Sequence, residues 1–272
     1  MITRQIWDNV WNKLEDQKLP ELTTEVEMEQ RSDRCQHILR FIKARGFNVT
    51  GLSVIEVGCG SAIYGCIMAQ LGAVVTALDQ SQGALARAQE RANAIGVDVK
   101  TVRAEALEFG KIWRGTFDMA MSFGTVEHFR APLREQMCKV HWELVRPGGV
   151  VVISVPNSLF LPHEFLKWLL MIKGKWFLGY EGSFTPWELK RVAQHLELGV
   201  LDFQGTDVID DLLKYWGIVT STRTWGQLFP WYKLKPSDHD VSKNALGSLG
   251  GARAMVNRWL GHEITLLGVK GN

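Results

Sequence analysis

The stretch "VIEVGCGSAIYG", Val54 to Gly65, joins an apolar run to a turn that holds two closely spaced glycines. The run predicts a buried strand, and the residues after Gly60 predict the start of a helix. Gly58 and Gly60 allow backbone angles and close approach that a side chain would prevent, and the amides that open the helix can receive a carboxylate or a phosphate. The stretch therefore predicts a strand, a turn and a helix that bind a ligand at the turn, with one carboxylate, Glu56, beside it.

Further apolar runs alternate with helical patterns along the chain. Strands that are apolar on both faces and alternate with helices indicate a parallel sheet covered on both sides. The fold class is therefore α/β: a Rossmann-like, doubly wound, seven-stranded, mostly parallel sheet with N-terminal helices and a helical insertion before the last strand. The predicted strands are "LSVIEVG", "AVVTALD", "VDVKTV", "FDMAMSF", "GVVVISVPN", "GVLDFQG" and "HEITLLGVKG". The expected helix starts lie near Ser61, Ser81, Glu105, Pro132 and Thr185, and "RPGG" (146–149) is expected to end a helix before the fifth strand.

The sequence divides into a core and three helical additions. Residues 1–50 are expected to form an N-terminal helical cap, because Ile6, Val10 and Leu14 recur at helical spacing and a second helical pattern runs to Gly46. The core comprises 51–208 and 262–272. Residues 159–182 and 209–261 are expected to form a helical lid or insertions, since the second of these is far longer than an ordinary connection.

Composition limits the classes of partner. The 272 residues are 46% hydrophobic and 22% charged, which predicts a soluble globular protein, and the net charge of +2 supplies no strong field for nucleic acid. The spacings of the four cysteines are unlike zinc sites, so we expect free thiols, no metal and a cytoplasmic location. The N-terminus lacks the apolar run of a signal peptide, and no segment has the length of a transmembrane helix.

Three acidic residues follow or end successive predicted strands: Glu56, Asp79 and Glu105. The carboxyl ends of parallel strands meet at one edge of the sheet, where ligands bind at the switch in strand order. Three carboxylates there would repel a phosphate chain. A dinucleotide fingerprint also needs a glycine where Ile63 stands. The pattern therefore favours a ligand with an amine and a ribose and no phosphate.

At these residues the chain resembles the class I S-adenosylmethionine-dependent methyltransferases, in particular the small-molecule group that includes the ubiquinone-biosynthesis type. The motifs that carry the resemblance are "IEVGCGSA", "ALDQS", "RAEALEF", "FDMAMSFGTVEHF" and "LVRPGGVVVISVPN", which cover roughly residues 50 to 160 in family-like order. The resemblance implies S-adenosylmethionine as cofactor and S-adenosylhomocysteine as product.

The resemblance also implies a set of cofactor-binding residues. Glu56 would lie near the methionine ammonium, Asp79 would hold the ribose hydroxyls, and Glu105, where the family usually has aspartate, would accept from the adenine amino group. The implied set is Glu56, Gly58, Cys59, Gly60, Asp79, Gln80, Ala104, Glu105, Ser122 and Phe123. The family's third glycine is Ala62 here, which is acceptable if that residue is already helical. The position of Cys59 in the turn favours a structural role for its thiol over nucleophilic catalysis.

The implied chemistry is in-line displacement, in which a nucleophile attacks the sulfonium methyl group. His128 in "TVEHF" is the candidate general base, because its ordinary pKa lies near neutrality and it follows the fourth strand. A histidine there can instead orient the acceptor or only pack. Glu127 can cap the next turn or face the cofactor, and His141 is expected to face solvent.

The segment "LFLPHEFLKWLLMIKGKWFLGY" is unusually apolar and aromatic for a connection. One interpretation is a lid that forms an apolar pocket for an aromatic or lipid-like acceptor. A second is a helix through 159–180 that rests on a membrane surface with Lys167, Lys173 and Lys175 near headgroups. A third is a helix packed on the domain or at a subunit interface. The oligomeric state is left open.

The leading hypothesis is thus methyl transfer to a small, hydrophobic or aromatic acceptor. Methylation of RNA or protein is a second hypothesis, although the fourth strand ends in "SFGT" and not in an Asn-Pro-Pro-Tyr type motif. The sequence also lacks a basic patch with interleaved aromatics, which argues against a nucleic-acid partner. A third hypothesis is a module that binds the cofactor without catalysis.

Overall fold

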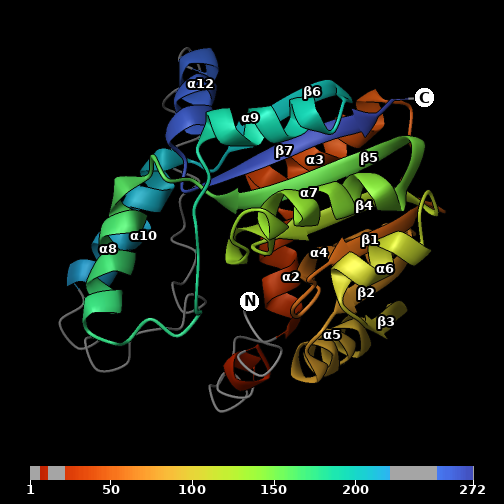
Figure 1. Cartoon of the computed structure of the whole chain (residues 1–272), viewed down its shortest axis with the longest axis horizontal. Helices are drawn as coiled ribbons and strands as arrows, with labels where there is room; N and C mark the ends of the chain where they lie inside the picture. The colour runs from red at the N-terminus through yellow and green to blue at the C-terminus, as the bar shows by residue number, and fades with distance from the viewer. Residues whose placement is uncertain (1–6, 12–21, 221–249, 272) are drawn as a thin grey trace.

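The computed structural model describes residues 7–11, 22–220 and 250–271. They form a seven-stranded sheet in the order β3-β2-β1-β4-β5-β7-β6, in which β7 alone runs antiparallel to both of its neighbours (Figure 1). The strands are β1 (Ser53–Val57), β2 (Val74–Asp79), β3 (Val99–Arg103), β4 (Phe117–Phe123), β5 (Val145–Pro156), β6 (Leu198–Gly205) and β7 (Glu263–Lys270). The predicted fold class is confirmed.

Helices cover both faces of this sheet. The described helices are α2 (Leu22–Gln30), α3 (Asp33–Ala44), α4 (Ile63–Gln70), α5 (Gln82–Ile95), α6 (Ala106–Ile112), the 3-10 turn η1 (Val126–His128), α7 (Leu133–Leu144), α8 (Leu161–Ile172), α9 (Pro186–His195), α10 (Val208–Thr220) and α12 (Gly250–Leu260). One apolar core packs α3, α4 and α5 on the sheet, and a second packs α6, α7 and α9 on its other face. Burial on both faces explains why the central strands are almost uniformly apolar.

The order of the strands reverses between β1 and β4. The chain moves from β1 outward to β2 and β3, then returns to β4 on the other side of β1. Ligands of open α/β sheets bind at the carboxyl ends of the strands beside this switch. The turn after β1 and the turn after β4 therefore meet at the expected ligand edge.

Local capping explains where two helices begin. The Ser81 hydroxyl accepts from the Ala84 amide at the start of α5, and the Thr185 hydroxyl accepts from the Glu188 amide at the start of α9. Such caps stabilise a helix by about 1 kcal/mol. Pro186 occupies the first turn of α9, where its missing amide hydrogen costs nothing. The helix starts predicted near Ser81 and Thr185 are confirmed.

One sequence expectation is wrong in detail. Residues 146–149 do not end α7, which stops at Leu144; they lie inside β5, where the pairing with β4 shifts register as in a bulge. The second N-terminal helical pattern, predicted to run to Gly46, corresponds to α3, which ends at Ala44 before a turn leads into β1. Ile6 and Leu14 lie outside the described residues.

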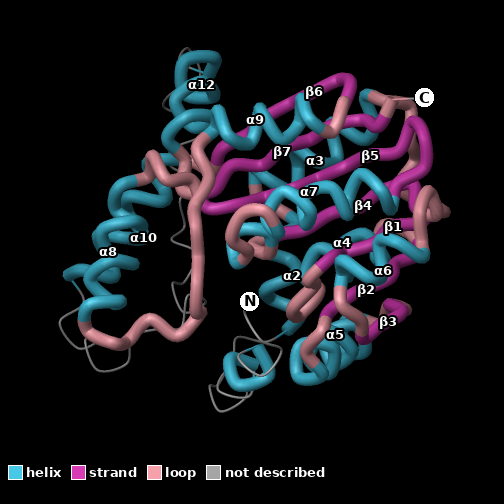
Figure 2. The backbone as a smooth tube through the Cα atoms, in the orientation of Figure 1, coloured by secondary structure: helices cyan, strands magenta, loops and turns pink. Residues whose placement is uncertain are grey.

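Helices α8 and α10 form a lobe beyond the carboxyl end of β5 (Figure 1). Its small apolar core comprises Phe160, Leu166, Leu170 and Tyr215, with Trp176 packed against it. Residues 173–185, which we call the strap, return from the end of α8 to α9 along the ligand edge of the sheet (Figure 2). The strap thereby connects the lobe to the site described next.

Candidate functional site

The turn between β1 and α4 has the backbone that its glycines require. Gly58 and Gly60 have φ values of 61° and 52°, in the left-handed region. A Cβ atom on Gly58 would lie 2.4 Å from the Thr125 side chain, and one on Gly60 would lie 2.7 Å from the ring of Trp11. Both glycines are thus needed for backbone conformation and for close packing.

Ala62 differs from its expected conformation. It is the N-cap of α4 in the left-handed region, with φ 52°, and not an already helical residue. The left-handed conformation costs a residue with a Cβ roughly 1–2 kcal/mol. The site tolerates alanine because the Ala62 side chain is fully buried in the core. Ala62 therefore adopts a left-handed backbone conformation without being a glycine.

Glu56 lies at the end of β1 with its carboxylate turned toward the start of α4. Its Oε2 atom accepts from the Gly65 amide at 2.7 Å, and the side chain is 4% exposed. Burial raises the pKa of Glu56 to about 8, against the lowering effect of the Gly65 amide and of Arg91. A buried carboxyl of this kind gains most from a cationic partner, since an opposite charge restores its ionised form.

Asp79 connects the glycine turn to α5. Its Oδ2 atom accepts from the Gly60 amide at 3.0 Å, and its Oδ1 atom accepts from the Ser81 amide at 2.8 Å. Burial raises the pKa of Asp79, and these amides oppose the shift. Each carboxylate oxygen has a second lone pair. Asp79 can therefore cap the turn and still accept from a ligand.

The next strand end brings the other predicted residues beside Asp79. The Ala104 amide donates to the Asp79 carbonyl at 3.1 Å, and the Gln80 carbonyl accepts from Arg103 at 3.3 Å. Glu105 follows as the exposed N-cap residue of α6, where partial desolvation raises the pKa of its carboxyl. The structure thus places Gln80, Ala104 and Glu105 at one edge with Asp79.

Three further predicted residues offer less to a ligand through their side chains. The Ser122 hydroxyl is completely buried in β4 and has no hydrogen-bond partner among the described residues. The Phe123 ring stacks on Tyr64 with a centroid distance of 3.5 Å. Cys59 is buried, and burial raises the pKa of its thiol, which leaves it protonated at neutral pH. Cys59 is held through its amide, which donates to the Leu78 carbonyl.

His128 lies on the other side of the strand switch, at the end of η1. Its Nδ1 atom is 2.9 Å from the Tyr180 carbonyl oxygen, which can only accept, so Nδ1 carries the hydrogen. Burial lowers the pKa of His128, and its ring is 7% exposed. The neutral imidazole therefore presents its lone pair on Nε2, which is the protonation state that a general base needs.

Two glutamates accompany His128. Glu127 is 2% exposed, its Oε1 atom lies 4.0 Å from His128 Nε2, and its Oε2 atom has no hydrogen-bond partner among the described residues. Burial, together with the negative charge of Glu181, raises the pKa of Glu127 to about 8, so it is mainly uncharged at neutral pH. Glu181 comes from the strap, where the Gly182 amide donates to the Glu127 carbonyl at 2.9 Å.

Residues 7–11 cover this edge of the sheet, which the sequence did not reveal. Asp8 Oδ1 accepts from the Ser81 hydroxyl at 2.7 Å and from the Gln82 amide at 3.2 Å. The Trp7 ring packs edge-on against His128 at 4.7 Å between centroids, and Trp11 lies against Gly60. One short helical segment thus contacts the cofactor turn, the second strand end and the candidate base. The only sequence signal was a pair of tryptophans one helical turn apart.

His141 contradicts its expectation. It was predicted to face solvent, yet it is completely buried within α7. Its Nδ1 atom lies 2.9 Å from the Met137 carbonyl of the preceding turn, which lets the ring remain buried. Burial lowers its pKa to about 4. His141 is therefore a neutral core residue remote from the proposed chemistry.

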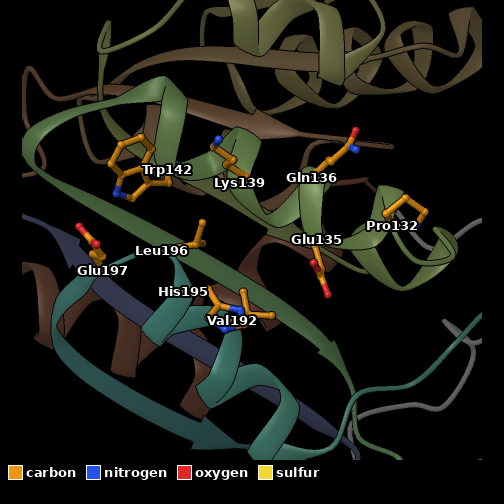
Figure 3. Close-up of a pocket in the computed structure, with 9 residues that line it drawn as sticks. All are labelled: Pro132, Glu135, Gln136, Lys139, Trp142, Val192, His195, Leu196 and Glu197. Carbon is orange, nitrogen blue, oxygen red and sulfur yellow. The ribbon is translucent and has the colours of Figure 1, made fainter.

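A surface groove of about 400 Å³ lies between α7 and α9, away from the strand ends (Figure 3). It is lined by Pro132, Glu135, Gln136, Lys139, Trp142, Val192, His195, Leu196 and Glu197. None of the predicted site residues contributes to it. The groove is therefore separate from the constellation around Asp79 and His128.

Comparison with known sequences identifies the family. The profile described as "Methyltransferase domain" matches residues 54–149. The ubiquinone biosynthesis O-methyltransferase of Aromatoleum aromaticum is 30% identical over 165 residues, which are 59% of this chain and 70% of that protein. The protein of the same name from Dinoroseobacter shibae is 29% identical over 180 residues, 62% of this chain and 68% of that protein. The chain belongs to the class I S-adenosylmethionine-dependent methyltransferases.

Solved structures support the same fold. Magnesium protoporphyrin IX methyltransferase from Synechocystis PCC 6803, solved with bound S-adenosylhomocysteine, has a TM-score of 0.55 and 14% identity, with 87% of this chain and 81% of that chain covered. An S-adenosylmethionine-dependent methyltransferase from Archaeoglobus fulgidus has the same TM-score and identity, with 90% and 97% covered. At these identities the likeness concerns the fold alone.

S-adenosylmethionine is the cofactor of this family, and the residues present fit it. The glycine turn approaches the ligand edge without side chains, and Glu56 is a buried carboxyl whose ionised form would gain from an ammonium group. Asp79 keeps lone pairs for hydroxyl donors, and Glu105 stands at the next strand end. This donor set suits an amine and a ribose and offers no cation for a phosphate chain.

Proposed function

We propose that this chain catalyses in-line methyl transfer from S-adenosylmethionine to a hydroxyl group of a small, hydrophobic or aromatic acceptor. The observation that supports this most strongly is the position of His128, opposite the cofactor turn at the strand switch. Its Nδ1 atom is committed to the Tyr180 carbonyl, so Nε2 is the basic atom. A base is useful only when the nucleophile carries a proton, as a hydroxyl does.

Each residue of the site has one task in this proposal. The bound cofactor supplies an electrophilic methyl group on a sulfonium. Glu56, Asp79 and Glu105 bind and orient it through the ammonium, the ribose hydroxyls and the adenine amino group. His128 Nε2 takes the proton from the acceptor hydroxyl as the oxygen forms its bond to the methyl carbon. Trp7 packs against the His128 ring and the partly buried strap binds its Nδ1 atom, so both exclude water from the space where the reactants align.

The relatives support a hydroxyl acceptor of this chemical class. Their printed name is ubiquinone biosynthesis O-methyltransferase, and the matched segments span 68% and 70% of the two relatives described above. That name places the transferred methyl group on an oxygen atom, which agrees with a hydroxyl nucleophile. The burial of His128 and Glu127 supplies an environment in which a neutral aromatic hydroxyl is favoured over a charged group.

The other two hypotheses have weaker support. Methylation of RNA or protein would need an open approach for a polymer, whereas His128 is buried beneath Trp7 and beside the strap. A module that binds cofactor without catalysis gives no reason for a buried imidazole next to a Glu127 carboxyl oxygen that has no hydrogen-bond partner in the described part of the chain.

A methyl-transfer assay tests the proposed function. The chain is incubated with methyl-labelled S-adenosylmethionine and a panel of small acceptors: catechols and phenols, aryl amines, a short RNA and a peptide mixture. Label is expected in the phenolic acceptors, with S-adenosylhomocysteine formed in equal amount. Transfer to amines, RNA or peptides and not to phenols would contradict hydroxyl methylation. Binding of S-adenosylhomocysteine without transfer to any acceptor would favour the non-catalytic module.

The outer face of α8 suggests a membrane contact in addition. Leu161, Phe165, Trp168 and Ile172 lie on one side of the helix and are 57–71% exposed. The opposite side packs into the lobe through Leu166 and Leu170. None of the described helices is long and apolar enough to cross a membrane. We propose that this face, with the lysines that follow α8, rests on the surface of an anionic membrane. We also propose that the chain resides in the cytoplasm, since its four cysteines are free thiols.

Vesicle binding tests the contact. The protein is expected to co-sediment with vesicles that contain anionic lipid, and Phe165→Glu with Trp168→Glu is expected to abolish this, because charged side chains would have to enter the apolar region. Trp187, 58% exposed on α9, supplies the matched control in Trp187→Glu, which should bind as the native chain does. A different result would indicate a subunit interface in place of a membrane contact: neither the native chain nor the variant with Phe165→Glu and Trp168→Glu binds vesicles, and the native chain forms dimers that this variant loses.

A further inference from the structure

The lobe and the strap place a chain of four polar side chains next to the site, and none of them lies in the region matched by the family profile. Glu181 Oε1 is 2.8 Å from His163 Nε2, and His163 Nδ1 is 2.8 Å from the Tyr215 hydroxyl. That hydroxyl is 3.1 Å from His262 Nε2. The chain therefore runs from the strap through α8 and α10 to the start of β7.

The polar chain ends on an ionised Glu181. Burial raises the pKa of Glu181, but hydrogen bonding and electrostatic attraction from His163, together with the charge of Lys167, lower it below its ordinary value. Glu181 therefore only accepts, and His163 Nε2 donates to it. The Tyr215 hydroxyl bonds to His163 Nδ1 on one side and to His262 Nε2 on the other, which holds the His163 ring in this orientation.

The strap fixes Glu181 beside His128. The residue before it supplies the carbonyl that binds His128 Nδ1, and the residue after it donates its amide to the Glu127 carbonyl at 2.9 Å. The backbone on both sides of Glu181 is therefore tied to the two residues of η1. The Glu181 side chain is 5% exposed, so its charge acts through protein with little screening by water.

From this geometry we infer that Glu181 is a positioning residue that stabilises the protonated form of His128 during the reaction. The inference rests on the proposed function of His128 as the base. The acceptor oxygen loses its proton to His128 Nε2 as it bonds to the methyl carbon, and the sulfonium leaves as a neutral thioether. The positive charge that remains on His128 is then balanced by Glu181. The chain that ends at His262 keeps Glu181 ionised and in place for this purpose.

The other charged groups around His128 do not cancel this effect. Lys167 on α8 opposes Glu181, since it lies 3.6 Å from the Glu181 carboxylate and lowers the pKa of His128. Its effect is smaller than that of Glu181, because the Lys167 ammonium is also bound by Glu164 at 2.9 Å. Glu127 on η1 is mainly uncharged at neutral pH. Of residues 7–11, it is Trp7 that contacts the His128 ring, and its indole carries no charge.

The pKa of His128, measured by nuclear magnetic resonance on the full chain without acceptor, tests the inference. His128→Asn identifies its signal among the seven histidines. Glu181→Gln is expected to lower the His128 pKa by about one unit. Lys167→Met is expected to raise it, and Tyr215→Phe, which breaks the middle of the chain, should lower it by less. Asp211→Asn is the matched control, because this buried carboxyl of the same lobe is bound by Thr206 and by the His262 amide and should leave the pKa unchanged.

The His128 pKa is expected to fall in Glu181→Gln and to rise in Lys167→Met, and these opposite directions distinguish an electrostatic effect from structural damage. A variant that merely loosens the lobe would expose His128 and raise its pKa in both the Glu181 and the Lys167 variants. An unchanged or raised pKa in Glu181→Gln overturns the inference. In turnover, the acid limb of kcat/KM should move to lower pH by the same unit in Glu181→Gln, with a lower plateau. If the pKa shifts occur but His128→Asn retains full methyl transfer, the proposed base is wrong and the electrostatic pairing stands.

Discussion

Replacing Asp79 with alanine is expected to lower the affinity for S-adenosylhomocysteine at least about 100-fold, measured by calorimetry. The carboxylate holds the Gly60 and Ser81 amides at 3.0 and 2.8 Å, so its removal also loosens the turn that faces the cofactor. Hydrogen bonds to a charged group contribute roughly 1.5–3 kcal/mol each, and two proposed bonds from the ribose hydroxyls are lost. Their sum reaches the ~3 kcal/mol that corresponds to 100-fold.

Asp118 provides the matched control for Asp79. It is also an aspartate that accepts from a backbone amide, since its Oδ2 atom binds the Ser53 amide at 2.8 Å. Ser53 begins β1, so this bond lies at the opposite end of the strand from the glycine turn. Asp118→Ala should therefore reduce stability and leave S-adenosylhomocysteine affinity within about twofold. Equal loss in both variants would show that Asp79 acts only through folding.

Local sequence was sufficient to predict the sheet and the acidic residues at its strand ends. The run from Val54 to Val57 is buried on both faces, as its composition indicated, and the glycines that follow adopt the left-handed angles for which glycine is suited. Capping by Ser81 also depends only on neighbours within three residues. These features repeat in each strand and helix unit, which is why the mostly parallel sheet and the places of Glu56 and Asp79 near the ends of β1 and β2 followed from the sequence.

The missed contacts depend on residues far apart in the chain. Asp8 meets Ser81 across 73 positions, and the Tyr180 carbonyl meets His128 across 52. The periodicity of apolar residues within a helix or a strand gives no information about such a pairing. The prediction for His141 failed for a different reason: α7 buries His141 beside Val140 and Leu144, so its buried face is wider than its apolar residues alone indicate. A hydrogen bond to the Met137 carbonyl lowered the cost of burying the ring.

Replacing His128 with asparagine is expected to lower kcat for methyl transfer by roughly 100-fold to 10,000-fold, the range typical of a lost general base. Asparagine can keep a donor toward the Tyr180 carbonyl, so the strap should stay in place, but it has no basic atom where Nε2 stands. S-adenosylhomocysteine affinity should remain unchanged, because the cofactor turn is held by Asp79 and Glu56. The two measurements together separate catalysis from cofactor binding.

The pH profile and a second histidine sharpen this test. Because burial lowers the pKa of His128, the native kcat/KM should stay high down to a pH below the ordinary histidine value of 6.5, then fall as Nε2 is protonated. This acid limb should vanish in His128→Asn. His195, which lines the surface groove between α7 and α9, is the control: His195→Gln should keep both the rate and the limb. If His128→Asn keeps the native rate with a phenolic acceptor, then the histidine only orients the substrate, and the proposed role of His128 as the base is wrong.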